Sequence, residues 1–268
     1  MNYSPKCNKK VISKGGKPQT QNEKDERDTQ FLFIERTRIQ YENQNNPVIS
    51  IDTKKKEMIG NFANKGKTWA VDGTATYDHD FRTYASGIAI PFGIYDCIKN
   101  IGRVFVGTSY DTAKFEVDSL VKWWLWYGKY EYPHASKILI LSDAGGSSGY
   151  RTKLWKVYLQ KNFCDRYHIQ VMVCHYSPGA SKWNPIEHRL FSEISKNWAG
   201  QPLINYEMML NYIRTTSTQT GLSSNAYLVN KEYAIGQKAN ASELSSLNIQ
   251  YPCCGNKLNY VISPIKKC

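Results

Sequence analysis

The feature that most constrains the fold is a set of short, nearly unbroken apolar runs. They cover residues 47–52 (Pro-Val-Ile-Ser-Ile-Asp), 137–143 (Lys-Ile-Leu-Ile-Leu-Ser-Asp) and 169–174 (Ile-Gln-Val-Met-Val-Cys). Runs of this kind are typical of central strands that are buried on both faces. The segments between and after them carry apolar residues at helical spacing, at about 112–127, 150–165 and 183–198. Because strands alternate with helices, the sequence predicts an α/β sheet.

Further elements and three regions are expected around these runs. We predict a strand at 104–108, strands or loops within 68–100 and a helix near 205–216. Residues 1–46 are polar and resemble an arm or linker remnant that could hold a short helix within 29–46. Residues 47–220 form the main α/β domain in this interpretation. Residues 221–268, rich in Gly, Asn and Ser, are expected to be an extension packed on that domain or trailing it.

The composition indicates what kind of partner the protein has. The net charge is +12, which favours nucleic acid because Lys and Arg neutralise phosphates; a merely basic protein is the alternative. A hydrophobic content of 41% excludes a disordered chain. No apolar run approaches the ~20 residues that span a bilayer, so no membrane partner is expected. Seven scattered cysteines without a CxxC pair argue against zinc and fit free thiols in a reducing cytoplasm.

Two of the predicted strands end on an acid, Asp52 and Asp143. Ligands bind at the carboxyl ends of strands in open α/β sheets, so both side chains are candidates for a functional site. An aspartate in a turn or at a helix cap is the alternative for each of them.

Glu187 is the third candidate. On a helical wheel of residues 183–198 it lies within an apolar stripe, where a carboxylate is costly unless it is paired or binds a metal. A salt bridge to a buried Arg or Lys is the alternative. The other members of the stripe are Trp183, Leu190, Phe191, Ile194 and Trp198.

Three carboxylates suit Mg²⁺ or Mn²⁺, which take oxygen ligands and keep several waters. Two such ions, ~3.5–4 Å apart, activate a water or a 3′-hydroxyl for phosphoryl transfer. Basic and aromatic residues lie next to all three acids in the sequence and are candidates for DNA contacts, although a solvated surface is the alternative for each. They are Lys54, Lys55, Lys56, Arg151, Lys153, Lys182 and Trp183.

These stretches resemble a known family. The segments 48–57, 142–149, 154–156 and 174–191 are similar to the ISAzo13-type insertion-sequence transposases, also described as a Rhodopirellula-type DDE transposase domain. The resemblance runs from about residue 25 to about 262 and is most specific at 174–198. Within it, Ser177-Pro and Asn184-Pro-Ile-Glu187 also resemble Tc1/mariner-like enzymes.

The resemblance implies an RNase H-like, retroviral-integrase-like fold with a mixed central sheet flanked by helices. It implies DNA strand cleavage and strand transfer in transposition, with Asp52, Asp143 and Glu187 as the catalytic triad that binds Mg²⁺ or Mn²⁺ as two ions. His175, Asn184 and His188 would lie beside the site. Element ends and target DNA would be the partners, and the protein would act as a homo-oligomer on DNA. The resemblance also implies that the usual N-terminal DNA-binding region is missing from this chain.

Two alternatives stay open. An RNase H-like nuclease or resolvase would only hydrolyse DNA and would give no joined product. A catalytically idle, truncated DNA-binding relic would keep the fold without the reaction. In each case we expect a cytoplasmic protein that associates with the nucleoid when it is bound to DNA.

Overall fold

A mixed β-sheet lies at the centre of the computed structural model, which describes residues 21–69, 73, 75–77, 79–252 and 257–265. Within these residues the sheet has nine strands, in the order β7-β4-β3-β1-β5-β6-β9-β8, with β2 paired to β3. The strands are β1 (Val48–Thr53), β2 (Glu57–Ile59), β3 (Gly87–Asp96), β4 (Ile101–Gly107), β5 (Lys137–Ser142), β6 (Gln170–His175), β7 (Ser223–Val229), β8 (Ile249–Gln250) and β9 (Asn259–Ile262).

The strand directions define the fold class. β1, β3 and β4 form an antiparallel meander, while β5 and β6 run parallel to β1. This order, β4-β3-β1-β5-β6, is the RNase H-like arrangement, so the predicted fold class is confirmed. The parallel pairing of β1 with β5 matters for function, because it brings the carboxyl ends of these two strands to the same edge.

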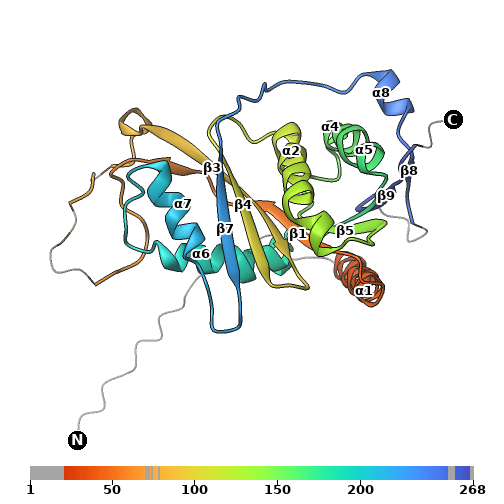
Figure 1. Cartoon of the computed structure of the whole chain (residues 1–268), viewed down its shortest axis with the longest axis horizontal. Helices are drawn as coiled ribbons and strands as arrows, with labels where there is room; N and C mark the ends of the chain where they lie inside the picture. Colours follow the sequence, from red (N-terminus) through yellow and green to blue (C-terminus); the bar gives the residue numbers. More distant parts are fainter. Residues whose placement is uncertain (1–20, 70–72, 74, 78, 253–256, 266–268) are drawn as a thin grey trace, which may run out of the picture.

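Helices cover both faces of the sheet and give a three-layer molecule (Figure 1). One face carries α2 (Ala113–Trp123), with the π-helical turn η2 (Trp124–Gly128) and α3 (Lys129–Glu131), and the run of α4 (Lys153–Tyr158), η3 (Leu159–Cys164) and α5 (Asp165–Tyr167). The other face carries α1 (Gln21–Asn43), the π-helical turn η5 (Glu187–Phe191), α6 (Ser192–Asn197) and α7 (Tyr206–Arg214). Short turns η1 (Arg82–Tyr84) and η4 (Ser181–Trp183) and helix α8 (Ala241–Ser245) complete the chain.

The apolar runs of the sequence contribute buried side chains to the core on each face of the sheet. In β1, Ile49 and Ile51 are fully buried and belong to the core that contains Phe115 of α2 and Trp155 of α4. Successive side chains of a strand point to opposite faces. The side chain of Asp52 therefore points away from that core, toward the face that η5 covers.

The N-terminal helix begins earlier than expected. α1 starts at residue 21, eight residues before the predicted helical segment, and Ile34 and Tyr41 pack on the sheet in a cluster with Leu139 of β5. Residues 21–43 are therefore a packed helix and not an arm. Residues 1–20 lie outside the described residues.

The expected boundary at residue 220 does not mark the end of the sheet. β7 pairs in parallel with β4 at one edge, and β9 pairs antiparallel with β6 toward the other. Only three of the seven positions of β7 are buried, so the strand lacks the continuous apolar run by which the central strands are predicted. β7, β8 and β9 therefore complete the sheet.

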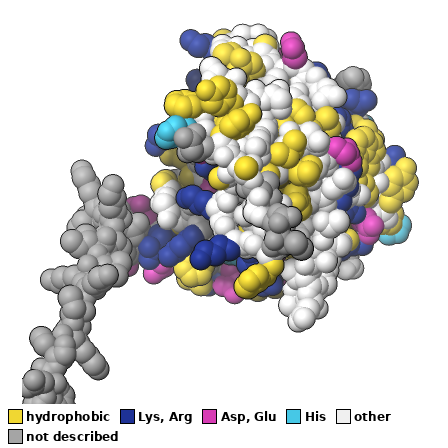
Figure 2. Space-filling view, turned by 90° about the vertical axis from the view of Figure 1, so that its left-hand side faces the viewer, with side chains coloured by type: hydrophobic (Ala, Val, Ile, Leu, Met, Phe, Trp, Pro, Cys, Tyr) yellow, Lys and Arg dark blue, Asp and Glu magenta, His cyan; other side chains and the backbone are white. Residues whose placement is uncertain are grey.

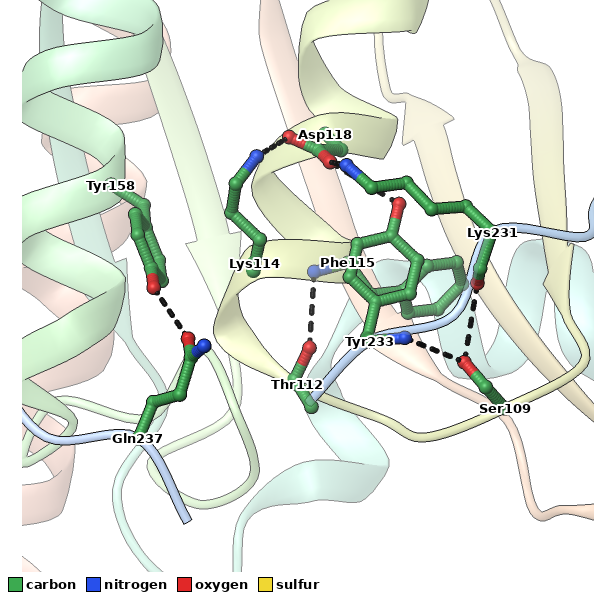
Figure 3. A network of polar contacts seen from close by, with 9 residues as sticks. All are labelled: Ser109, Thr112, Lys114, Phe115, Asp118, Tyr158, Lys231, Tyr233 and Gln237. Atoms are coloured by element: carbon green, nitrogen blue, oxygen red, sulfur yellow. Dashed lines mark hydrogen bonds and ion pairs between the residues drawn. The ribbon is translucent and has the colours of Figure 1, made fainter. Parts of the chain in front are cut away.

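The segment 230–240 crosses from β7 to α8 over the beginning of α2 (Figure 3). Lys231 Nζ and the Tyr233 hydroxyl both contact Asp118 of α2, at 2.8 and 3.2 Å. Tyr233 N donates to Ser109 Oγ at 3.2 Å, and the Tyr158 hydroxyl donates to Gln237 Oε1 at 2.8 Å. These contacts fix the crossing segment against the helical layer and link the two edges of the sheet.

Candidate active site

The three predicted acids lie together at one edge of the sheet. Asp52 is near the end of β1, Asp143 directly follows β5, and Glu187 begins η5. Burial, the charge of Asp143 and a hydrogen bond with Glu187 raise the pKa of Asp52 to about 8. Burial also raises the pKa of Asp143, and the charge of Glu187 acts in the same direction. Such mutual repulsion of carboxylates in a partly desolvated place is typical of functional sites.

Asn184 fixes the position of Asp143 relative to β1. Its side chain is fully buried, and its Nδ2 donates to Asp143 Oδ1 at 3.1 Å and to the Ile51 carbonyl at 3.2 Å. Its Oδ1 accepts a hydrogen bond of 2.5 Å from Ser50 Oγ, which in turn accepts one of 3.1 Å from Ile186 N. Together, Asn184 and Ser50 therefore attach both Asp143 and the first residues of the helix that carries Glu187 to β1.

Ser50 is a site residue that was not predicted from the sequence. It lies in an otherwise apolar strand, two positions before Asp52, and therefore points to the same face. Its hydroxyl is fully buried. A polar residue on the acid-bearing face of a buried strand is the signal that could have identified it.

Gly93 allows the Glu187 helix to approach the sheet. It is opposite Asp52 in the β1–β3 register. A Cβ atom at this position would lie 2.7 Å from both Ile186 Cδ1 and Phe191 Cε1, which is closer than two carbon atoms normally approach. The glycine therefore sets the distance between Glu187 and the strand that carries the first acid.

The helical wheel of residues 183–198 was partly wrong. Leu190, Phe191, Ile194 and Trp198 are buried as predicted, but Glu187 is only half-buried and Trp183 is 56% exposed. Residues 181–183 form a separate 3₁₀ turn and residues 187–191 a π-helical turn, so the segment does not advance by 100° per residue. Glu187 therefore lies at the border of the core, beside the other two acids.

A hollow of about 680 Å³ opens next to Asp52 and Asp143. Two loops form most of its wall, the segment after β5 and the segment after β6. Its other lining residues are Ala144, Gly145, Gly146, Gly149, Tyr150, Arg151, Thr152, Ser177, Pro178, Gly179 and Ser181. Small residues dominate this wall, so a bulky ligand can approach the two carboxylates closely.

The basic side chains beside the acids are not equivalent. Arg151 lines the hollow, and Lys55, Lys56, Lys153 and Lys182 are exposed, so these five are available to a ligand. Trp183 is exposed as well and makes an edge-on contact with Phe31, with ring centroids 5.7 Å apart.

Lys54 differs from the expectation that it contacts DNA. Its Nζ forms a 2.7 Å ion pair with Glu57 Oε1 and lies 4.7 Å from the ring centroid of Trp198, and its side chain is only 12% exposed. Lys54 is therefore occupied in packing the β1–β2 connection onto α6.

The two candidate histidines have different places. His175 is fully buried, with Nδ1 2.8 Å from the Leu258 carbonyl and Nε2 3.0 Å from the Ser148 carbonyl. Burial lowers the pKa of His175. The ring therefore connects the loop after Asp143 to the segment before β9, which is a structural role. His188 is exposed on η5, next to Glu187.

The donor set of the site consists of carboxylate oxygens, which are the ligands that Mg²⁺ and Mn²⁺ prefer. As the side chains stand, with Asp52 hydrogen-bonded to Glu187, no group of three or more His, Cys, Asp or Glu within the described residues could hold a metal ion. The carboxylates of Asp52, Asp143 and Glu187 lie close together and supply oxygen ligands, so the chemistry of the donor set fits such a metal. No helix in the described parts of the chain has the length and apolar content to cross a membrane.

The sheet order defines an RNase H-like domain in which Asp52, Asp143 and Glu187 lie together at one edge of the sheet. The chain belongs to the Rhodopirellula transposase DDE domain family, whose model matches residues 11–264. No curated protein matches the chain in sequence.

Solved structures of Mos1 transposase are similar to the chain. A pre-cleavage Mos1 transpososome shares 13% identity with a TM-score of 0.49, covering 76% of this chain and 59% of that one. The Mos1 paired-end complex with the left transposon end shares 14% identity with a TM-score of 0.47, covering 76% and 58%. The chain thus spans somewhat under three fifths of the length of these transposases.

Proposed function

We propose that this chain is the catalytic domain of a DDE transposase, which cuts DNA strands and joins them during transposition of an insertion sequence. The observation that carries the proposal is the convergence of Asp52, Asp143 and Glu187 at the ends of β1 and β5. They meet in a chain that belongs to a DDE transposase domain family.

The three acids would hold Mg²⁺ or Mn²⁺, as a pair of ions. Bound there, these ions supply the positive charge that activates a water or a 3′-hydroxyl and stabilises the leaving oxygen of a phosphodiester. Asn184 keeps the Asp143 carboxylate turned toward β1 through its 3.1 Å hydrogen bond. The proton that Asp52 holds near neutral pH has to leave before the carboxylates can bind a cation.

Basic side chains around the acids would hold the DNA backbone. Arg151 lies in the wall of the hollow, and Lys55, Lys56, Lys153 and Lys182 are exposed nearby in the sequence. Phosphate contacts of this kind position a duplex without reading its sequence. Trp183, more than half exposed, offers a surface on which an unpaired base can stack.

A second side of the molecule offers further contacts. Figure 2 faces the side that carries α7, and it shows Lys and Arg side chains gathered at the lower left of the molecule. Residues 60–86 expose the aromatic side chains of Trp69, Phe81 and Tyr84. We propose that element ends and target DNA are both bound, by a homo-oligomer of the protein acting in the cytoplasm on nucleoid DNA.

The test is a strand-transfer assay with DNA that carries the ends of the insertion sequence, in the presence of Mn²⁺. We expect both nicked and joined products, and Asp143→Asn should lower the rate about 10³-fold or more, because it removes a charge that holds the catalytic ions. Asp28→Asn is the control, since that carboxylate is exposed on α1. Nicks without joined product would show a nuclease, and a rate that Asp143→Asn leaves unchanged would refute the proposed site.

A further inference from the structure

A second pair of acids lies at the end of β1, on the face opposite Asp52. Asp111 precedes α2, and Glu116 is in the first turn of this helix. Thr53 Oγ1 lies 3.4 Å from both Asp111 Oδ1 and Glu116 Oε1. Because Thr53 follows Asp52 in the strand, its side chain points to the other face. The pair is therefore separate from the proposed triad, although the charge of Asp52 also reaches Glu116.

Glu116 is the feature that calls for a ligand. The residue is 2% exposed, and its Oε2 atom has no hydrogen-bond partner. Within the described residues, neither Asp111 nor Glu116 has an ion pair within 4 Å. Lys56 contributes only a longer-range attraction to Asp111. Buried carboxylates are normally paired or bound to a metal, and the N-terminal end of α2 offsets only a small part of this cost.

The surroundings of the pair supply oxygen atoms. The Ser148 side chain faces the Glu116 carboxyl and lies 3.2 Å from Ser142 Oγ. The loop after Asp143 is also tied to the pair, because Ser147 Oγ donates to the Asp111 carbonyl at 3.2 Å. Asp111 lines a hollow of about 210 Å³, which gives access from solvent. Two carboxylates, two hydroxyls and water are ligands that suit a hard divalent cation.

We propose that Asp111 and Glu116, with the hydroxyls of Thr53 and Ser148, bind a divalent cation such as Mn²⁺ or Mg²⁺, distinct from any ion held by the proposed triad. This cation joins the end of β1, the start of α2 and the loop after Asp143. It therefore fixes the loop that carries the second acid. The proposal goes beyond the transposition reaction and does not require it.

The direct test counts Mn²⁺ bound to the full chain without DNA, from the electron paramagnetic resonance signal of free Mn²⁺. The measurement uses an Asp143→Asn background, in which the triad is impaired. We expect Glu116→Gln to weaken the remaining binding at least about 10-fold, by analogy with losses from altered metal shells. Asp111→Asn should act in the same way. A Mn²⁺ isotherm that neither substitution alters would overturn the proposal and leave a carboxyl pair that shares a proton.

A second readout does not depend on counting ions. In EDTA, Glu116→Gln should melt at the same temperature as the unaltered chain or higher, because it replaces a buried carboxyl that has no ion pair with an amide of the same shape. Added Mn²⁺ should raise the melting temperature of the unaltered chain by more than that of the variant. Equal increments in the two proteins would contradict the proposal.

Asp118→Asn is the matched control. Asp118 lies on the same helix, but it is paired with Lys114 and Lys231. Its substitution should lower the melting temperature in EDTA and leave the Mn²⁺ increment unchanged. The two proposals fail separately. If Glu116→Gln loses Mn²⁺ binding but the unaltered chain shows no strand transfer, only the transposase function is refuted. If the unaltered chain shows strand transfer but Glu116→Gln leaves the Mn²⁺ isotherm unchanged, only the second cation site is refuted.

Discussion

Replacing Asn184 by alanine removes the side chain that connects β1, Asp143 and the Glu187 helix. The amide makes three hydrogen bonds, to Ser50, Ile51 and Asp143. Two neutral bonds at about 1 kcal/mol each and one bond to a carboxylate at about 1.5–3 kcal/mol give about 3.5–5 kcal/mol. Because Asp143 lines an open hollow, water can replace part of the last bond. We therefore expect Asn184→Ala to lower the free energy of unfolding by about 2–4 kcal/mol.

Urea unfolding followed by circular dichroism measures this loss, and a double-mutant cycle with Ser50→Ala isolates the bond between the two side chains. The two changes should be non-additive by about 0.5–1.5 kcal/mol, because either one removes the same bond. Asn211→Ala, on the exposed side of α7, should stay within about 0.5 kcal/mol. Strictly additive losses, or a loss from Asn184→Ala no larger than that of Asn211→Ala, would refute the proposed network.

Three further predictions follow from the packing and the charges. In EDTA, the free energy of unfolding should fall as pH rises from about 4 to about 8 and level off above it, because folded Asp52 keeps its proton to about pH 8 while the unfolded residue loses it near 4. Asp52→Asn should reduce this slope in urea titrations at pH 5 to 9. Gly93→Ala should lower the free energy of unfolding by about 1–3 kcal/mol by overpacking. Phe191→Leu in the same protein should restore part of this loss, since the added Cβ meets the Phe191 ring. A double variant that is no more stable than Gly93→Ala would contradict this account. Tyr260→Phe should lower the free energy of unfolding by about 1–2 kcal/mol in the same assay, because Trp155 Nε1 loses the hydroxyl that accepts its 3.0 Å hydrogen bond. An unchanged free energy of unfolding would mean that water replaces this hydroxyl.

The central strands and the two aspartates were predictable because their signal is local. A strand that is buried on both faces needs a nearly unbroken apolar run, and β1 and β5 have one. Parallel neighbours end at the same edge, so the positions of Asp52 and Asp143 in the sequence already imply that they meet. Thr112 caps α2, with its hydroxyl accepting from Phe115 N.

Other features depend on partners that are distant in the sequence. The C-terminal strands were not predicted, since β7 buries only three of its seven residues and β8 has two residues. The position of Glu187 depends on a π-helical turn that a regular wheel does not contain. Lys54 and Lys55 are adjacent in the sequence and have the same local composition around them. The side chain of Lys54 packs inside because it lies over the ring of Trp198, which is far away in the sequence.

The place of β9 has a consequence for the synthesis of the protein. β9 covers the outer edge of β6. The buried side-chain amides of Gln30 on α1 and Asn259 on β9 form two hydrogen bonds of 2.8 Å with each other. The ribosome must therefore release almost the entire chain before α1 can make its final contacts. Until then the edge of β6 stays open to strands of other nascent chains. We therefore expect the newly synthesised chain to be prone to edge-to-edge association until β9 has paired with β6.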